Sequence, residues 1–202
     1  MGNETPWNRG RKLPPEVLTP GEVKVLMGAC STRAPTGIRN RALITVLYRG
    51  LLRIEEALAL KPKDLDREPG TIRVLHGKGD KSRTVGLDDG AWAVLEVWLE
   101  RRTALGMNGK HPLFCNLKGK RLLPSYCRAL FPRLAAKAGI DKRVHPHALR
   151  HTGASEMRTE GIDVGVISKQ LGHSSIATTS RYLDHIAPAV VVEAVRRRKW
   201  EA

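Results

Sequence analysis

The sequence has few cysteines, little acidic charge and no long apolar run. Its three cysteines, Cys30, Cys115 and Cys127, are odd in number and lack CxxC spacing. This pattern predicts free thiols in a reducing compartment and not a disulfide framework. No apolar stretch approaches the roughly 20 residues of a membrane span, and residues 1–16 lack the apolar core of a signal peptide. We therefore expect a cytoplasmic protein without a membrane segment.

The shortage of acidic residues points to a polyanionic partner. The 202 residues include 20 Asp and Glu against 35 Lys and Arg, which gives a formal net charge of +15 at pH 7. Such an excess favours nucleic acid or an anionic membrane. The Met-Gly start is a weak myristoylation signal because Pro6 stands where Ser or Thr is needed. Nucleic acid is therefore the preferred partner. The length suits one large domain or two small ones.

Capping residues and helical spacing of apolar residues predict four helices in the first 140 residues. They are expected at about 19–30, where Thr19 and Glu22 should form a capping box, at 38–48, at 88–104, which Asp88 and Asp89 can cap, and at 125–138. A basic, flexible leader or linker remnant is expected at 1–18. A loop through Pro35 and Gly37 should precede the second helix, and Ser125 should cap the fourth. Pro132 should kink or divide the fourth helix, and Gly139 should end it.

Residues 71–87, TIRVLHGKGDKSRTVGL, predict a β-hairpin. β-favouring residues flank a turn that contains Gly77, Gly79 and Asp80. A phosphate-binding loop is the weaker interpretation, since the turn lacks the G-x-x-x-x-G-K-[ST] pattern leading into a helix. Residues 113–123 are expected to form a small hairpin or a structured turn. The fold class predicted is therefore mainly α with a small β-hairpin or sheet (α+β).

Several residues whose side chains can take part in catalysis lie in the stretch 145–182, HPHALRHTGASEMRTEGIDVGVISKQLGHSSIATTSRY. His147 and Arg150 share a helix face at i, i+3. Gly172 should end a helix before His173, and the following serines should cap another helix that carries Tyr182. Each residue alone has an ordinary structural interpretation. A zinc site at His147 and His151 is weaker, because neither an adjacent Glu nor a third ligand is evident.

Together, H-x-L-R and L-G-H-S-S-x-x-T-T-x-x-Y resemble the motifs of the tyrosine recombinase (phage integrase) family. LLRIEEALAL at 51–60 is similar to the family box that contains Arg53 and Glu56, and GKGDKSR at 77–83 is similar to the hairpin that contains Lys78. The family usually has Gly two residues before that arginine, whereas this chain has Leu51. The resemblance covers about residues 19–195 and implies a catalytic domain at 19–186.

The resemblance also implies a DNA strand transferase that needs neither metal nor ATP nor another cofactor. Tyr182 would form a 3′-phosphotyrosine, which keeps the bond energy for rejoining, while Arg53 and Arg150 hold the scissile phosphate in fork geometry. Lys78 would protonate the leaving 5′ hydroxyl. Among the remaining residues, His147 would be a general base or proton carrier, His173 would bond a phosphate oxygen, and Glu56 would support the site.

The resulting expectation is a site-specific recombinase, bacterial or phage-encoded, acting on double-stranded DNA. The alternatives are type IB topoisomerase-like relaxation and a non-catalytic DNA-binding module. The presence of Tyr182 and Lys78 argues against the module, and the integrase-like text around the histidines argues against the topoisomerase. Self-association to a dimer or tetramer is expected on DNA, with accessory DNA-bending proteins as further candidate partners.

The two ends of the sequence leave alternatives open. Family members generally carry a helical domain before the catalytic one, whereas only about 18 residues precede the first helix here. The chain is thus either a minimal member or a fragment, and weak, salt-sensitive DNA binding is expected. The tail at 187–202 has the apolar spacing of an amphipathic helix. It should pack on its own domain or pass to a neighbouring protomer.

Overall fold

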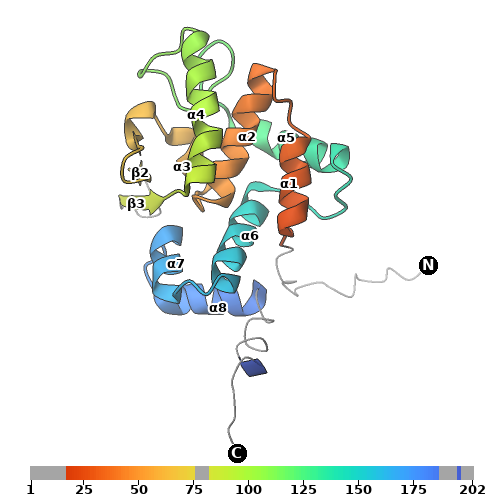
Figure 1. The fold of residues 1–202 in the computed structure, drawn as a ribbon, viewed down its shortest axis with the longest axis vertical. Coiled ribbons are helices and arrows are strands. Elements are labelled where there is room, and N and C mark those ends of the chain that lie inside the picture. Colours follow the sequence, from red (N-terminus) through yellow and green to blue (C-terminus); the bar gives the residue numbers. More distant parts are fainter. Residues whose placement is uncertain (1–16, 76–81, 187–194, 197–202) are drawn as a thin grey trace, which may run out of the picture.

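The computed structural model describes residues 17–75, 82–186 and 195–196 (Figure 1). The helices of the described residues are α1 (Pro20–Gly28), α2 (Pro35–Tyr48), α3 (Ile54–Ala59), the 3-10 helix η1 (Pro62–Asp64), α4 (Asp89–Ala104), α5 (Pro124–Lys137), α6 (Pro146–Thr159), α7 (Val164–Leu171) and α8 (Ile176–Ile186). The strands are β1 (Leu65–Asp66), β2 (Thr71–Val74) and β3 (Arg83–Gly86). The expected fold class, mainly helical with a small sheet, is confirmed. None of the described helices has the length and apolar character needed to cross a membrane.

Local chemistry explains where the first and fourth α-helices begin. Thr19 and Glu22 form the predicted capping box of α1, each satisfying a backbone N–H of the other. Asp88 caps α4 by accepting a hydrogen bond from the Ala91 N–H. The packed chain begins before Thr19, because Leu18 is buried and its N–H donates to the Thr152 hydroxyl at 2.9 Å.

Two helix starts differ from the prediction, and proline is the reason in both cases. α2 begins at Pro35, three residues earlier than expected, and Gly37 lies inside it. α5 begins at Pro124, so Ser125 is not its cap. Proline is tolerated in the first turn because its missing N–H would be unpaired there anyway. α5 also continues through Pro132 as one helix.

The predicted hairpin is present and forms two strands of a three-stranded antiparallel sheet in the order β1-β2-β3. Its register pairs Thr71 with Gly86 and Val74 with Arg83. The turn that contains Lys78 lies outside the described residues. β1 was not predicted, since two residues carry no periodic signal. At 113–123 there is a single bridge between Cys115 and Arg121, which makes this segment a structured turn.

Two hydrophobic clusters hold the fold together. The larger surrounds α2, which packs against α4 and α6. The smaller consists of Leu51, Ala154, Ile167, Leu171 and Leu183. It joins α6, α7 and α8 to the loop after α2, and Figure 1 shows α6 extending from the main body toward the α7–α8 pair. The three cysteines are buried and free.

Candidate active site

Arg53 lies immediately before α3 and is anchored by Glu56. The spacing of Arg53, Glu56 and Leu60 in the sequence predicts one helical face with an Arg53–Glu56 pair. The Arg53 backbone is instead extended (φ −73°, ψ 152°), and Arg53 and Leu60 flank the helix. The expected pair nevertheless forms. Arg53 Nη1 lies 2.9 Å from Glu56 Oε1, and the Arg53 N–H donates to Oε2 at 2.8 Å. Glu56 is buried, with 4% of its surface exposed, so this is not a solvated surface pair.

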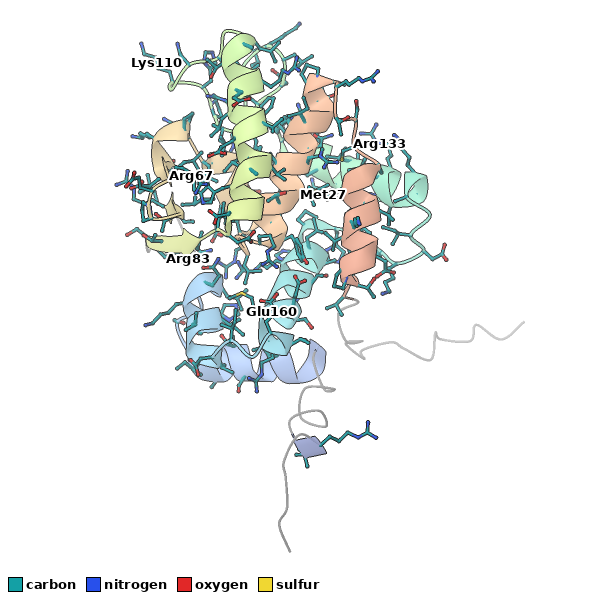
Figure 2. All side chains as sticks on the ribbon, in the orientation of Figure 1. Met27, Arg67, Arg83, Lys110, Arg133 and Glu160 are labelled. Atoms are coloured by element: carbon teal, nitrogen blue, oxygen red, sulfur yellow. The ribbon has the colours of Figure 1, made fainter. Side chains whose placement is uncertain are left out.

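A second arginine, Arg83 of β3, binds the same carboxylate and was not predicted as a site residue. Its Nη1 and Nη2 donate to the two Glu56 oxygens at 2.9 and 2.8 Å, a bidentate geometry. Burial disfavours the charged form of Glu56, but the hydrogen bonds from Arg83 and Arg53 outweigh it and lower its pKa to about 2. Figure 2 labels Arg83 between the sheet and α7. Glu56 is therefore a carboxylate shared by two arginines.

Arg150 of α6 is buried and fixed by main-chain oxygens. Its Nη1 donates to the Leu51 carbonyl, and its Nη2 donates to the Leu171 carbonyl at 2.6 Å. These acceptors belong to the loop before Arg53 and to the end of α7. Leu51 has a positive φ of 51°, a conformation that favours glycine. At this position the chain has leucine where the family usually has glycine, and the backbone is left-handed despite the leucine side chain.

His147 lies one turn before Arg150 on α6, as predicted. The N-cap of this helix is His145, whose Nδ1 accepts a hydrogen bond from the Ala148 N–H at 3.2 Å. Burial first, and then the charges of Arg150 and Arg53, lower the pKa of His147 below its usual 6.5. The imidazole is therefore neutral at pH 7 and can accept a proton. Among the described residues, no three His, Cys, Asp or Glu side chains are grouped as metal ligands.

The turn between α7 and α8 places His173. Gly172 ends α7 in the left-handed conformation (φ 64°), as the Leu-Gly-His text predicted. His173 Nδ1 lies 2.9 Å from the hydroxyl of Thr179, which is fully buried in α8. Tyr182 lies three residues further along this helix. The Tyr182 side chain and all of Lys78 lie outside the described part of the structure.

The structure thus brings four of the predicted site residues together: Arg53 pairs with Glu56, and the charges of Arg53 and Arg150 act on His147. His173 lies on the adjoining turn. Together with the helical body and the small antiparallel sheet, this arrangement defines the catalytic domain of the tyrosine recombinases. The chain belongs to the phage integrase family, whose model matches residues 16–187.

Curated relatives agree with this assignment. The chain is 37% identical over 182 residues to tyrosine recombinase XerD of Corynebacterium glutamicum, covering 88% of this chain and 59% of that protein. It is 38% identical over 196 residues to tyrosine recombinase XerC of Xanthomonas axonopodis pv. citri, covering 95% and 62%. The chain therefore spans about three-fifths of the length of these relatives.

Solved structures show the same fold. The crystal structure of XerA recombinase superposes with a TM-score of 0.79 at 33% identity, covering 96% of this chain and 70% of that one. XerH recombinase bound to palindromic difH substrate gives a TM-score of 0.73 at 32% identity, covering 95% and 55%. The catalytic domain of bacteriophage HP1 integrase gives 0.60 at 26% identity, covering 93% and 96%.

Proposed function

We propose that this chain is the catalytic domain of a site-specific DNA recombinase that cuts and rejoins double-stranded DNA through a 3′-phosphotyrosine. The observation that carries the proposal is the pair of anchored arginines. Arg150 is fixed by two carbonyls, and Arg53 is fixed by a buried carboxylate. Cations held in place before the reaction stabilise charge that grows on the phosphate without reorganising. Two guanidinium groups suit the non-bridging oxygens of a phosphodiester.

The proposed reaction exchanges one phosphoester for another. The Tyr182 oxygen attacks phosphorus, the bond to the 5′ oxygen breaks, and the phosphate is left joined to tyrosine. His147 accepts the phenol proton, because its lowered pKa leaves the imidazole unprotonated at pH 7. Lys78 donates a proton to the leaving 5′ oxygen. The reverse attack by the 5′ hydroxyl of another strand reseals the DNA, so no external energy source is needed.

His173 is proposed to donate a hydrogen bond to a phosphate oxygen. The contact between its Nδ1 and the Thr179 hydroxyl supports this role. If the hydroxyl donates to Nδ1, the proton of the neutral ring is on Nε2, which makes Nε2 a donor. The same contact fixes the turn relative to α8, the helix that carries Tyr182.

Double-stranded DNA is the proposed partner. The net charge of +15 supports a polyanionic ligand, and the XerH site-specific recombinase, 32% identical to this chain, was solved bound to palindromic difH substrate. Much of the affinity should come from phosphate contacts, and binding should therefore weaken steeply as salt rises. Assembly into a dimer or tetramer on DNA, through the tail at 187–202, is part of the proposal, with DNA-bending proteins as accessory partners.

Covalent trapping tests the proposal. The protein is incubated with genomic DNA fragments that carry random nicks, and the DNA attached to it under denaturing conditions is sequenced. A nick just 3′ of the cleavage point releases the 5′ end and prevents rejoining. We expect one enriched sequence with the wild type and no adduct with Tyr182→Phe, which should still bind DNA. An adduct at the wild-type level with Tyr182→Phe would eliminate the assignment.

A plasmid assay then separates recombination from relaxation. Two copies of the recovered sequence are placed on one supercoiled plasmid, and a single copy on another. A recombinase should exchange the paired sites. Relaxation of both plasmids without exchange would instead assign the chain a topoisomerase-like activity.

A further inference from the structure

Arg83 is a charged residue of the site for which the proposed reaction gives no role. It comes from β3, whereas Arg53 and Glu56 come from α3 and the residue before it. Its side chain is 13% exposed and that of Glu56 only 3%. Both terminal nitrogens of Arg83 are engaged with Glu56, and this bidentate bond links the sheet to α3.

Arg83 also lies against the turn that carries His173. A Cβ built on Gly172 would be 2.7 Å from both Cδ and Nε of Arg83, so any larger residue there would displace the arginine. The Gly86 N–H and carbonyl of the same strand bond the side chain of Gln170 in α7. Arg83 thus lies where the sheet, α3 and the end of α7 meet. Its own strand, the Glu56 carboxylate and the backbone at Gly172 together fix its position.

The charges around Glu56 show what Arg83 changes. A single carboxylate bound to Arg53 alone would hold that arginine in place but would cancel its charge. With Arg83 added, two guanidinium groups share one carboxylate, and the trio keeps a net charge of +1. In a buried setting this difference matters more than at the surface, because solvent screens it less.

We propose that Arg83 is a positioning residue for the phosphate site, which lets Glu56 anchor Arg53 without neutralising the charge that Arg53 offers to DNA. The inference rests on the proposed function, because the charge has a role only if a phosphate is bound at Arg53. Arg83 acts through Glu56 and Arg53 and need not touch the phosphate.

The first test is the rate of covalent adduct formation in a single turnover. The substrate is a nicked duplex carrying the sequence recovered by trapping, at saturating protein. Arg83→Gln should slow the step by tenfold or more, and Arg83→Lys, which keeps the charge, should lose less. Arg67→Gln is the control, since Arg67, labelled in Figure 2, also bonds two carboxylate oxygens, one from Asp89 and one from Glu96, but is about half exposed. Its rate should equal the wild type. Equal rates for Arg83→Gln and Arg67→Gln would overturn the inference.

The second test separates charge from simple structural support. The double variant Arg83→Gln with Glu56→Gln restores the net charge of +1 at Arg53, so it should regain part of the lost rate. Circular dichroism at the assay temperature confirms that each variant compared is folded. A double variant as slow as, or slower than, Arg83→Gln would show that charge is not what Arg83 supplies.

The pH dependence gives a third readout that lost packing would not produce. Without Arg83, only the hydrogen bonds from Arg53 oppose the effect of burial, so the pKa of Glu56 should rise. Protonation of Glu56 would then free the charge of Arg53. The ratio of the wild-type rate to the Arg83→Gln rate should therefore shrink on acidification from pH 8 to pH 5. Among the described residues, Lys61, Lys63, Asp64 and Arg73 line a pocket with Glu56; they are present in both proteins, so their effects cancel in the ratio. A ratio independent of pH would contradict the mechanism.

The failure of the inference and that of the proposed function are distinguishable. If the wild type forms no Tyr182-dependent adduct, the proposed function fails. If the wild type forms the adduct and Arg83→Gln behaves as Arg67→Gln does, only the role of Arg83 fails.

Discussion

Gly153 is the point at which α6 touches the end of α2, and adding one methyl group there should disturb the site. A Cβ at this position would lie 1.9 Å from the Tyr48 carbonyl oxygen and 2.6 Å from Leu51 Cδ2. The obstacle is backbone, so it cannot turn aside as a flexible side chain would. Gly153→Ala must therefore move α6 away from the loop at Leu51, whose carbonyl accepts a hydrogen bond from Arg150.

The expected magnitude follows from two opposing effects. Overpacking a close contact costs about 1–3 kcal/mol, and a backbone obstacle puts this contact at the upper end of that range. Replacing glycine by alanine inside a helix returns up to about 1 kcal/mol. The net loss in unfolding free energy is about 2 kcal/mol, which corresponds to a fall in Tm of about 4–8 °C for a chain of this size.

Gly28→Ala provides a matched control, because Gly28 also lies in a helix but has no neighbour within 4 Å of a built Cβ. The same substitution should raise Tm there by up to a few degrees, because Gly28 is the last residue of α1 and the gain is at most about 1 kcal/mol. Thermal unfolding followed by circular dichroism measures both variants. Gly153→Ala should also slow adduct formation more than it weakens DNA binding. A Tm at or above the wild type for Gly153→Ala would refute the close approach of α6 and α2.

Three further predictions concern the hydrogen bonds and titrations of the site. Thr179→Val should slow single-turnover adduct formation about 2- to 10-fold, because it removes a neutral hydrogen bond worth about 0.5–1.5 kcal/mol. Thr179→Ser keeps the hydroxyl and should retain the wild-type rate. An unchanged rate in the valine variant would contradict the role proposed for the His173–Thr179 contact. Burial first, and then the charges of His147, His145 and Arg150, lower the pKa of His151 to about 4, so the unfolded chain, with its pKa near 6.5, takes up the proton first. The stability that neutral His151 contributes should be complete above pH 6.5 and decline toward pH 4. The Tm of His151→Gln should therefore fall less steeply over this range than that of the wild type; parallel plots of Tm against pH would contradict the lowered pKa of His151. Lys78→Ala should cleave an ordinary DNA strand poorly but recover on a 5′-bridging phosphorothiolate, whose sulfur leaves without protonation; equal loss on both substrates would make Lys78 a binding residue.

Features decided by neighbours in the sequence were predictable. The capping box at Thr19, the cap at Asp88 and the helix end at Gly172 each depend on groups within a few residues, and all three are present. The hairpin strands also followed from local composition. The starts of α2 and α5 were misplaced because a proline can either interrupt a helix or occupy its first turn, and sequence text does not separate the two.

Contacts between distant residues left no comparable signal. Glu56 and Arg83 are 27 positions apart, and only the folded sheet brings them together. The anchors of Arg150 are main-chain oxygens 99 and 21 positions away, and every residue carries such an oxygen. One clue was available for Arg83. It is the last charged residue of GKGDKSR and stands directly before the strand-forming Thr84 and Val85, so it had to lie at the start of a strand.

The use of main-chain oxygens to hold Arg150 has a consequence for how this domain can change over evolutionary time. A carbonyl is retained whatever side chain accompanies it, so the anchor places no chemical demand on the identity of residues 51 and 171. The residues at these positions are constrained only by the backbone conformation and by the packing of the small hydrophobic cluster to which they belong. A leucine can thus occupy a left-handed position at which glycine is usual, and the arginine still finds its acceptor. Substitutions at these two positions that preserve the backbone should therefore leave Arg150, and with it the proposed phosphate site, in place.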